Sequence, residues 1–210
     1  MSLKKLVRRI LIENDQQGLL KLVSENRGAV TALNRLIFDQ DELVRWRAVA
    51  ALGWVAKADP YLLEKIIGRL IYTMNDDSGS IGWTAPQALG EICANDPDLV
   101  EDFFPIVISS IKIPAFQRGV IWAIGRVGPV RPDLVEGTGP MLISFLNSPE
   151  AEIRGETCRA LGRLRWSPAG PELGRLVSDS ATFTVYQDEQ LAKMTVGQAA
   201  REALALLNRP

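Results

Sequence analysis

A short tripeptide recurs along the chain at nearly constant spacing. Ala51-Leu52-Gly53 returns as Ala88-Leu89-Gly90, Ala123-Ile124-Gly125 and Ala160-Leu161-Gly162, and more weakly as Ala203-Leu204-Ala205. The spacings between the alanines are 37, 35, 37 and 43 residues. A period of this size is typical of repeat proteins, in which copies of one small motif stack and bury a shared core.

A proline follows each of the first four alanines by eight or nine residues: Pro60, Pro97, Pro132 and Pro168. Asp59, Asp96 and Ser167 precede three of them, whereas Arg131 departs from this pattern. Asp or Ser followed by Pro is typical of a helix start. Each unit is therefore predicted to be a first helix, a turn and a second helix. In the middle units we expect the first helix over about 60–75, 97–112 and 132–147, the earliest of these ending in a turn at 75–79.

The second helices share one apolar stripe, spaced i, i+4, i+7, i+8 and i+11. In chain order the stripes are Val44, Ala48, Ala51, Leu52, Val55; Ile81, Ala85, Ala88, Leu89, Ile92; Phe116, Val120, Ala123, Ile124, Val127; Ile153, Thr157, Ala160, Leu161, Leu164; and Val196, Ala200, Ala203, Leu204, Leu207. This spacing predicts amphipathic helices that bury one face. The central alanine and the glycine after it allow neighbouring helices to approach closely.

These motifs resemble those of the HEAT-repeat family. The match is carried by residues 44–53 (Val-Arg-Trp-Arg-Ala-Val-Ala-Ala-Leu-Gly), Glu152-Ile153-Arg154 and Ala160-Leu161-Gly162. The sequence is similar to the bacterial HEAT-like repeats of the phycobilin lyase subunit type, and the resemblance covers about residues 27–208. The resemblance implies an all-α fold, a right-handed α-α superhelix (α-solenoid) of about five helical hairpins. We expect one domain over 1–210, with an N-terminal helical cap at 3–24 and repeats at about 27–58, 59–95, 96–130, 131–166 and 167–208.

Three positions depart from the family pattern. Arg45 and Arg154 match the family's usual arginine, but other repeats carry Gly82, Gln117 and Gly197. Pro86, inside the second helix of its repeat, predicts a late start or a kink there. The last unit is irregular over 178–184, as terminal units often are.

Composition excludes several classes of function. The 210 residues include no histidine, so a Ser-His-Asp or Cys-His site and an imidazole metal ligand are excluded. The 24 basic and 25 acidic side chains give a formal charge of −1, which argues against a dedicated duplex-binding protein. Cys93 and Cys158 are expected to be small buried residues of a reducing cytoplasm. No catalytic residue, metal or cofactor is predicted, and no stretch is long and apolar enough to cross a membrane.

The side chains beside the buried stripe of the second helices form the candidate site. By resemblance to HEAT arrays these helices line the concave face. Its predicted partner-binding residues are Trp46, Trp54, Trp83, Gln87, Glu91, Arg118, Trp122, Arg126, Arg159 and Arg163. Tryptophan and arginine dominate binding hot spots, and the arginine guanidinium forms bidentate hydrogen bonds with carboxylates. We expect Trp83→Ala plus Trp122→Ala to leave the fold largely intact.

The leading hypothesis is a non-catalytic scaffold that binds a protein or peptide partner on this face. The structural alternative is that the tryptophans pack against one another and that Glu91 and Arg126 simply pair. One functional alternative is a phycobilin-lyase-like or other enzyme-subunit role. Another is nucleic-acid binding like that of HEAT-like alkylpurine DNA glycosylases. The concave sites of those enzymes combine tryptophans, a carboxylate and arginine, and the same residue types occur here at Trp83, Glu91, Trp122 and Arg126. No feature points to a small-molecule ligand, and HEAT-type deoxyhypusine hydroxylases are excluded because they depend on histidine.

Overall fold

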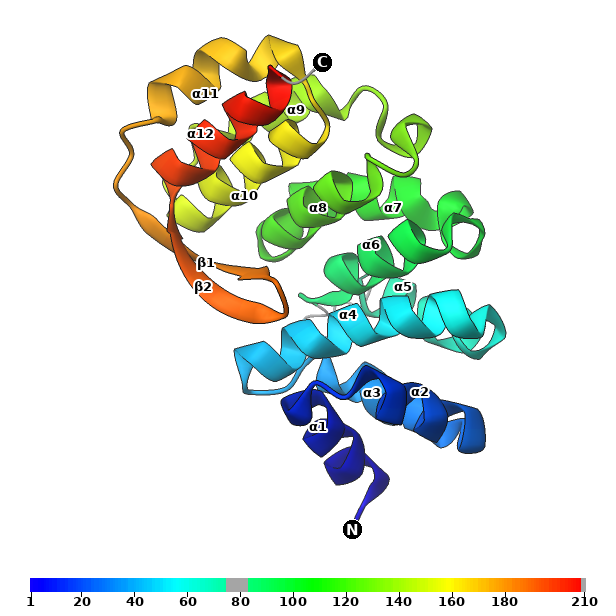
Figure 1. The fold of residues 1–210 in the computed structure, drawn as a ribbon. Helices are drawn as coiled ribbons and strands as arrows, with labels where there is room; N and C mark the ends of the chain where they lie inside the picture. The colour runs from blue at the N-terminus through cyan, green and yellow to red at the C-terminus, as the bar shows by residue number, and fades with distance from the viewer. Residues whose placement is uncertain (75–82, 209–210) are drawn as a thin grey trace.

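Twelve α-helices dominate the part of the chain that the structure, a computed structural model, describes: residues 1–74 and 83–208. They are α1 (Leu3–Glu13), α2 (Gln16–Glu25), α3 (Gly28–Leu36), α4 (Glu42–Ala58), α5 (Glu64–Met74), α6 (Ala85–Asn95), α7 (Phe104–Ser109), α8 (Pro114–Val127), α9 (Thr138–Phe145), α10 (Ala151–Arg163), α11 (Gly170–Leu176) and α12 (Val196–Leu207). They stack into a curved α-solenoid (Figure 1). The second helices pack in chain order, α4 on α6, α6 on α8, α8 on α10 and α10 on α12.

The predicted stripes of the second helices form the continuous core. Nearly all of their residues are buried, as expected from the spacing. Leu164, Leu204 and Leu207 are only half-buried against this core, and Ile81 lies outside the described residues. The free cysteines Cys93 and Cys158 are also buried, which confirms that expectation.

The recurrent glycine fits against the alanine of the next unit. A Cβ added to Gly90 would lie 2.6 Å from Cβ of Ala123. A Cβ on Gly125 would lie 2.8 Å from Cα of Ala160, and one on Gly162 would lie 2.7 Å from Cα of Ala203. Side chains other than glycine at these three positions would force the helices apart. Gly53 differs, because its Cβ would meet the side chains of Asn95 and Glu91.

The first helices are shorter than predicted. Each begins with 3-10 turns, at Pro60–Leu62, Pro97–Leu99, Glu101–Phe103, Pro132–Val135 and Ser167–Ala169. The expected capping role of Asp59 and Asp96 was wrong. Their side chains make no capping hydrogen bond, and their backbone N–H groups instead donate to Val55 O and Ile92 O at the end of the preceding helix. The residue before a proline avoids the α conformation, so it ends one helix without starting the next.

Two other local predictions have different outcomes. Pro86 lies in the first turn of α6, which confirms the late start, because a missing N–H costs little at that position. The predicted turn at 75–79 and Gly82 lie outside the described residues. Among the described residues no helix has the length and apolarity that crossing a membrane requires.

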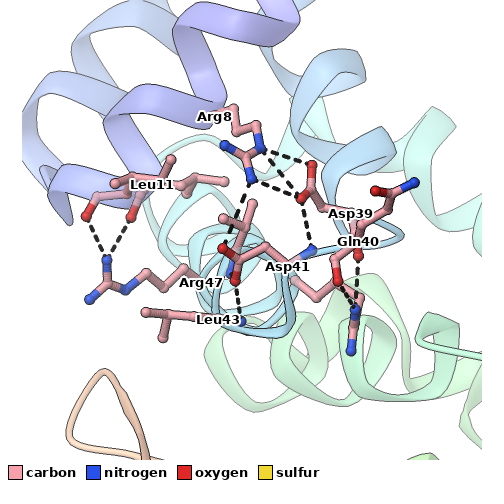
Figure 2. A network of polar contacts seen from close by, with 10 residues as sticks. Arg8, Leu11, Asp39, Gln40, Asp41, Leu43 and Arg47 are labelled. Carbon is pink, nitrogen blue, oxygen red and sulfur yellow. Dashed lines mark hydrogen bonds and ion pairs between the residues drawn. The ribbon is translucent and has the colours of Figure 1, made fainter.

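The N-terminal segment forms two helices, α1 and α2. Val7, Ile10 and Leu11 of α1 are buried, and α1 packs on α3 and α4. Arg8 ties this helix to the turn between α3 and α4, with its Nε 3.1 Å from Oδ2 of Asp39 (Figure 2).

A β-hairpin interrupts the last unit, between α11 and α12. Its strands are β1 (Thr182–Gln187) and β2 (Gln190–Thr195), paired antiparallel from Thr182↔Thr195 to Gln187↔Gln190. The turn residues Asp188 and Glu189 both have positive φ, 49° and 62°, as in a type I′ turn. The hairpin reaches from the last unit across the hollow side of the solenoid to the region of α4 (Figure 1). The sequence indicated only an irregular segment here.

Candidate functional site

The hairpin lies on the inner face, over residues predicted to bind a partner. The ring of Tyr186 stacks on Trp46, with centroids 5.5 Å apart and planes 3° apart. Trp46 also contacts Trp122, with centroids 5.3 Å apart. Trp46 is 6% exposed and Trp122 is 7% exposed, so these two tryptophans are core residues in this conformation. For them the structural alternative holds, and the expectation that Trp122→Ala spares the fold was wrong.

Two predicted arginines hold the hairpin through polar contacts. Nη2 of Arg118 donates to the carbonyl oxygen of Thr184 at 2.8 Å, while its Nη1 pairs with Glu152 at 3.1 Å. Nη1 of Arg159 donates to Oε1 of Gln187 at 3.3 Å. At the base of the hairpin, a Cβ on Gly155 would lie 2.2 Å from the ring of Phe183. The inner face therefore receives both main-chain and side-chain groups of the hairpin.

Arg47 is a further site residue that the sequence analysis missed. It is only 5% exposed, and its Nη1 donates to the carbonyl oxygens of Leu11 at 3.0 Å and Ile12 at 2.7 Å (Figure 2). Nε and Nη2 donate to the carbonyl oxygen of Glu189 at 3.3 and 3.2 Å. No local signal could have revealed this role, because the acceptors are main-chain groups 35 to 142 residues away.

Glu91 and Arg126 form an ion pair between α6 and α8. Nε and Nη2 of Arg126 donate to the two carboxylate oxygens at 2.7 and 3.0 Å, and Nδ2 of Asn95 donates to Oε1 at 2.9 Å. The hydrogen bonds to Glu91 raise the pKa of Arg126. The structural alternative is confirmed for this pair.

A buried carboxyl group lies among the arginines of α10. Glu156 is 2% exposed, and its Oε2 lies 3.8 Å from Nε of Arg159. Burial raises the pKa of Glu156, opposed by the charges of Arg159, Arg118 and Arg163. Burial, reinforced by Arg159, lowers the pKa of Arg163. Arg163 makes no hydrogen bond or ion pair within residues 1–74 and 83–208, and it lines a pocket of about 750 Å³ with Trp166.

An open groove crosses the first turns of α4, α6 and α8. It has a volume of about 100 Å³ and is lined by Glu42, Arg45, Trp46, Trp83, Thr84, Gln87, Ala115, Arg118 and Gly119. Trp83 is 48% exposed, and the guanidinium carbon of Arg45 lies 5.3 Å from its ring centroid. Oε1 of Gln87 is buried without a hydrogen-bond partner among the described residues. A Cβ on Gly119 would lie 2.3 Å from that oxygen, so glycine leaves it room.

Four predicted residues therefore meet at one groove: Trp46, Trp83, Gln87 and Arg118. Trp54 is not among its lining residues and packs half-buried against the core. Within the described ranges, no three acidic or cysteine side chains lie close enough to hold a metal ion. Burial raises the pKa of Cys93 and of Cys158 to about 12, so neither thiol is a ready nucleophile.

Comparison with known proteins identifies the repeat. Residues 114–164 match the family described as HEAT-like repeat. The solved structure of the designed armadillo repeat protein YIII(Dq)4CqI superposes with a TM-score of 0.59 at 20% identity, covering 98% of this chain and 92% of that one. Residues 114–164 are thus a HEAT-like repeat, and the chain has the fold of an α-solenoid.

Other similar structures share this α-solenoid fold. The designed armadillo repeat protein YIII(Dq.V1)4CPAF, in complex with peptide (KR)4, has a TM-score of 0.58 and 19% identity over 98% of this chain and 91% of that one. Computationally designed armadillo repeat proteins for modular peptide recognition have a TM-score of 0.57 and 20% identity, covering 98% of this chain and 92% of that one. No curated protein matches the sequence. Assignment of the repeats to the phycobilin lyase type stays a prediction.

Proposed function

We propose that this solenoid is a non-catalytic scaffold that binds a protein or peptide partner on its inner face, which the second helices line. The observation that carries the proposal is the groove at Trp83. A tryptophan that is 48% exposed, with Arg45 over its ring, is a hot-spot arrangement. The ring offers apolar area to a partner.

The fold supports a peptide as the partner. A stack of similar helices presents side chains at regular intervals, which suits an extended segment. One of the similar structures holds a peptide, and this chain shares only the fold with it. The same proposal includes one domain of five repeats with a cap. It also places the protein in the cytoplasm, because two unpaired cysteines suit a reducing compartment.

The predicted residues outside the groove are expected to contribute to partner binding to different degrees. Glu91 and Arg126 satisfy each other, so we expect them to contribute little to partner binding. Arg163 has no such acceptor and is the better candidate to meet a partner carboxylate, while Trp54 offers a half-buried apolar edge. The glycosylase-like set is not assembled as an open site, because Trp122 is buried and Glu91 is bonded to Arg126. This arrangement favours a protein partner over a nucleic acid.

Substitution of Trp83 tests the proposal. The tagged protein is used to capture proteins from its native cytosol, alongside Trp83→Ala and the control Tyr72→Ala. Tyr72 is 70% exposed on α5 and does not line the groove, so it controls for loss of an exposed ring. We expect a stoichiometric partner that Tyr72→Ala retains and Trp83→Ala loses by at least tenfold. Equal capture by all three proteins would contradict the proposal.

A further inference from the structure

The tip of the hairpin, residues 186–191, sits on the inner face as a bound peptide would. Its tyrosine ring stacks on Trp46, and the carbonyl oxygen of Glu189 accepts from Arg47. The side chain of Asn14, after α1, donates to the carboxylate of Glu189. These contacts join residues more than 100 positions apart, so the tip is an occupant of a surface built by other units.

The hairpin base and the hairpin tip are held differently. At the base, Phe183 and Met194 lie opposite each other and are 1% and 4% exposed. In the tip, the four residues from Gln187 to Gln190 are exposed, and the hydroxyl of Tyr186 is buried without a hydrogen-bond partner among the described residues. Release of the tip therefore uncovers the ring of Trp46, while Phe183 and Met194 keep the base anchored.

The tip adjoins the open groove. Trp46 and Arg118 line that groove, and the same two residues contact Tyr186 and the Thr184 carbonyl. A partner seated against Trp83 therefore lies directly beside the hairpin. Arg118 donates to a carbonyl of an extended strand, Thr184, and Arg47 donates to a carbonyl of the turn, Glu189. This surface therefore binds main-chain carbonyl oxygens, and the stacking position on Trp46 selects an aromatic ring.

Resting on the proposed function, we propose that the partner is a strand-and-turn segment with an aromatic side chain that takes the place of the hairpin tip. Its ring stacks on Trp46, and its carbonyl oxygens accept from Arg47 and Arg118. The tip is then a competitor within the same chain. Because it is tethered, its effective concentration is high, and weakening its contacts raises the apparent affinity for a partner.

The first experiment measures a defined probe by fluorescence anisotropy. The probe is a labelled synthetic peptide with the sequence of residues 182–193, compared with the same peptide carrying alanine in place of its tyrosine. The proteins are wild type, Tyr186→Ala and the control Gln190→Ala, whose exposed side chain makes no hydrogen bond or ion pair with the described residues. We expect Tyr186→Ala to bind the probe at least tenfold more tightly than wild type, Gln190→Ala to match wild type within twofold, and the alanine peptide to bind none of the three.

The second experiment fixes the tip in place, so the inference does not depend on one substitution. Asn14→Cys and Glu189→Cys are joined by a short bismaleimide, and the control is the same double variant blocked with N-ethylmaleimide. The native thiols are buried and poorly ionised, so labelling is confined to the new pair. We expect the crosslinked chain to lose probe binding and the blocked control to retain it.

Three outcomes would overturn the inference, two of them in the probe measurements. One is equal probe binding by the crosslinked and blocked chains, and the other is binding by Tyr186→Ala no tighter than by wild type. Capture of a Trp83-dependent partner that persists unchanged after crosslinking would also overturn it, while leaving the proposed function intact. Capture that does not depend on Trp83 would instead remove the proposed function, and the probe measurements do not involve Trp83.

Discussion

At the scale of single residues, the tryptophans of the second helices differ in burial rather than in chemistry. Trp122 is 7% exposed against Trp46, whereas Trp83 is 48% exposed. Trp122→Ala is expected to lower the free energy of unfolding by about 3–5 kcal/mol, because it removes a packed ring and leaves a cavity. Trp83→Ala removes an exposed cation–π contact and is expected to cost only about 0.5–1 kcal/mol. Urea unfolding measures both, and equal costs would contradict the assignment of Trp122 to the core.

Glu156 predicts a dependence of stability on pH. Burial raises its pKa in the folded chain above the ordinary value of 4.5, so the folded state binds more protons than the unfolded state. The free energy of unfolding should therefore fall as pH rises from 4.5 through the folded pKa. Glu156→Gln keeps the size and removes the charge, so it is expected to be more stable than wild type at neutral pH. Thermal unfolding between pH 4 and 8 checks this, and a constant difference between the two proteins would refute it.

At the scale of elements, the glycines separate into two kinds. A Cβ on Gly125 of α8 would meet the backbone of Ala160 at 2.8 Å, whereas nothing lies within 4 Å of one on Gly68 of α5. Gly125→Ala is expected to destabilise by about 1–3 kcal/mol because two helices must separate. Gly68→Ala is expected to stabilise by about 0.5–1 kcal/mol because the residue is in a helix interior. Chemical denaturation of the two variants tests the contrast, which fails if both shift the same way.

Two arginines make the same hydrogen bonds to the turn between the first and second helices of their units. Nη1 of Arg45 donates to the carbonyls of Asp39 and Gln40 at 2.9 and 3.1 Å. Nη1 of Arg154 donates to the equivalent carbonyls of Ser148 and Pro149 at 2.8 and 3.0 Å. The arginine of the repeat motif thus binds the turn between the two helices from the start of the second helix. In both units the acceptor carbonyls lie five and six residues before the arginine, so the contact is local to one unit.

At the scale of the whole molecule, the hairpin changes how the solenoid holds together. Repeat arrays are stabilised by contacts between neighbours. Here Arg47 joins α1, α4 and the hairpin of the last unit, so the first and last units are also linked. Replacing residues 184–193 by a short Gly-Ser linker is therefore expected to widen the superhelix and to make unfolding less cooperative.

Small-angle scattering and urea unfolding test this expectation. The radius of gyration should rise, and the transitions followed by far-ultraviolet circular dichroism and by tryptophan fluorescence should separate. Gln190→Ala serves as the control with the hairpin in place. An unchanged radius together with coincident transitions would show that neighbour contacts alone fix the curvature.

The hairpin also marks the limit of prediction from this sequence. Its strands alternate at Phe183 and Val185, but its turn is Asp188-Glu189, which lacks the Asn-Gly or Asp-Gly signal of a type I′ turn. Its stability comes from burial against Gly155 and Trp46, residues 28 and 140 positions from their hairpin partners. Local pattern carries no information about such contacts.

The sequence by itself determined the repeat, the buried stripe of each second helix and the glycine-to-alanine contact between units. These depend on helical periodicity and on side-chain size within one period, both of which are local. The tertiary structure alone decided which side chains of the inner face are accessible. It stacked Tyr186 on Trp46, packed Trp122 against Trp46, paired Glu91 with Arg126 and left Trp83 open. Accessibility depends on what packs above a surface, and here that cover comes from the opposite end of the chain.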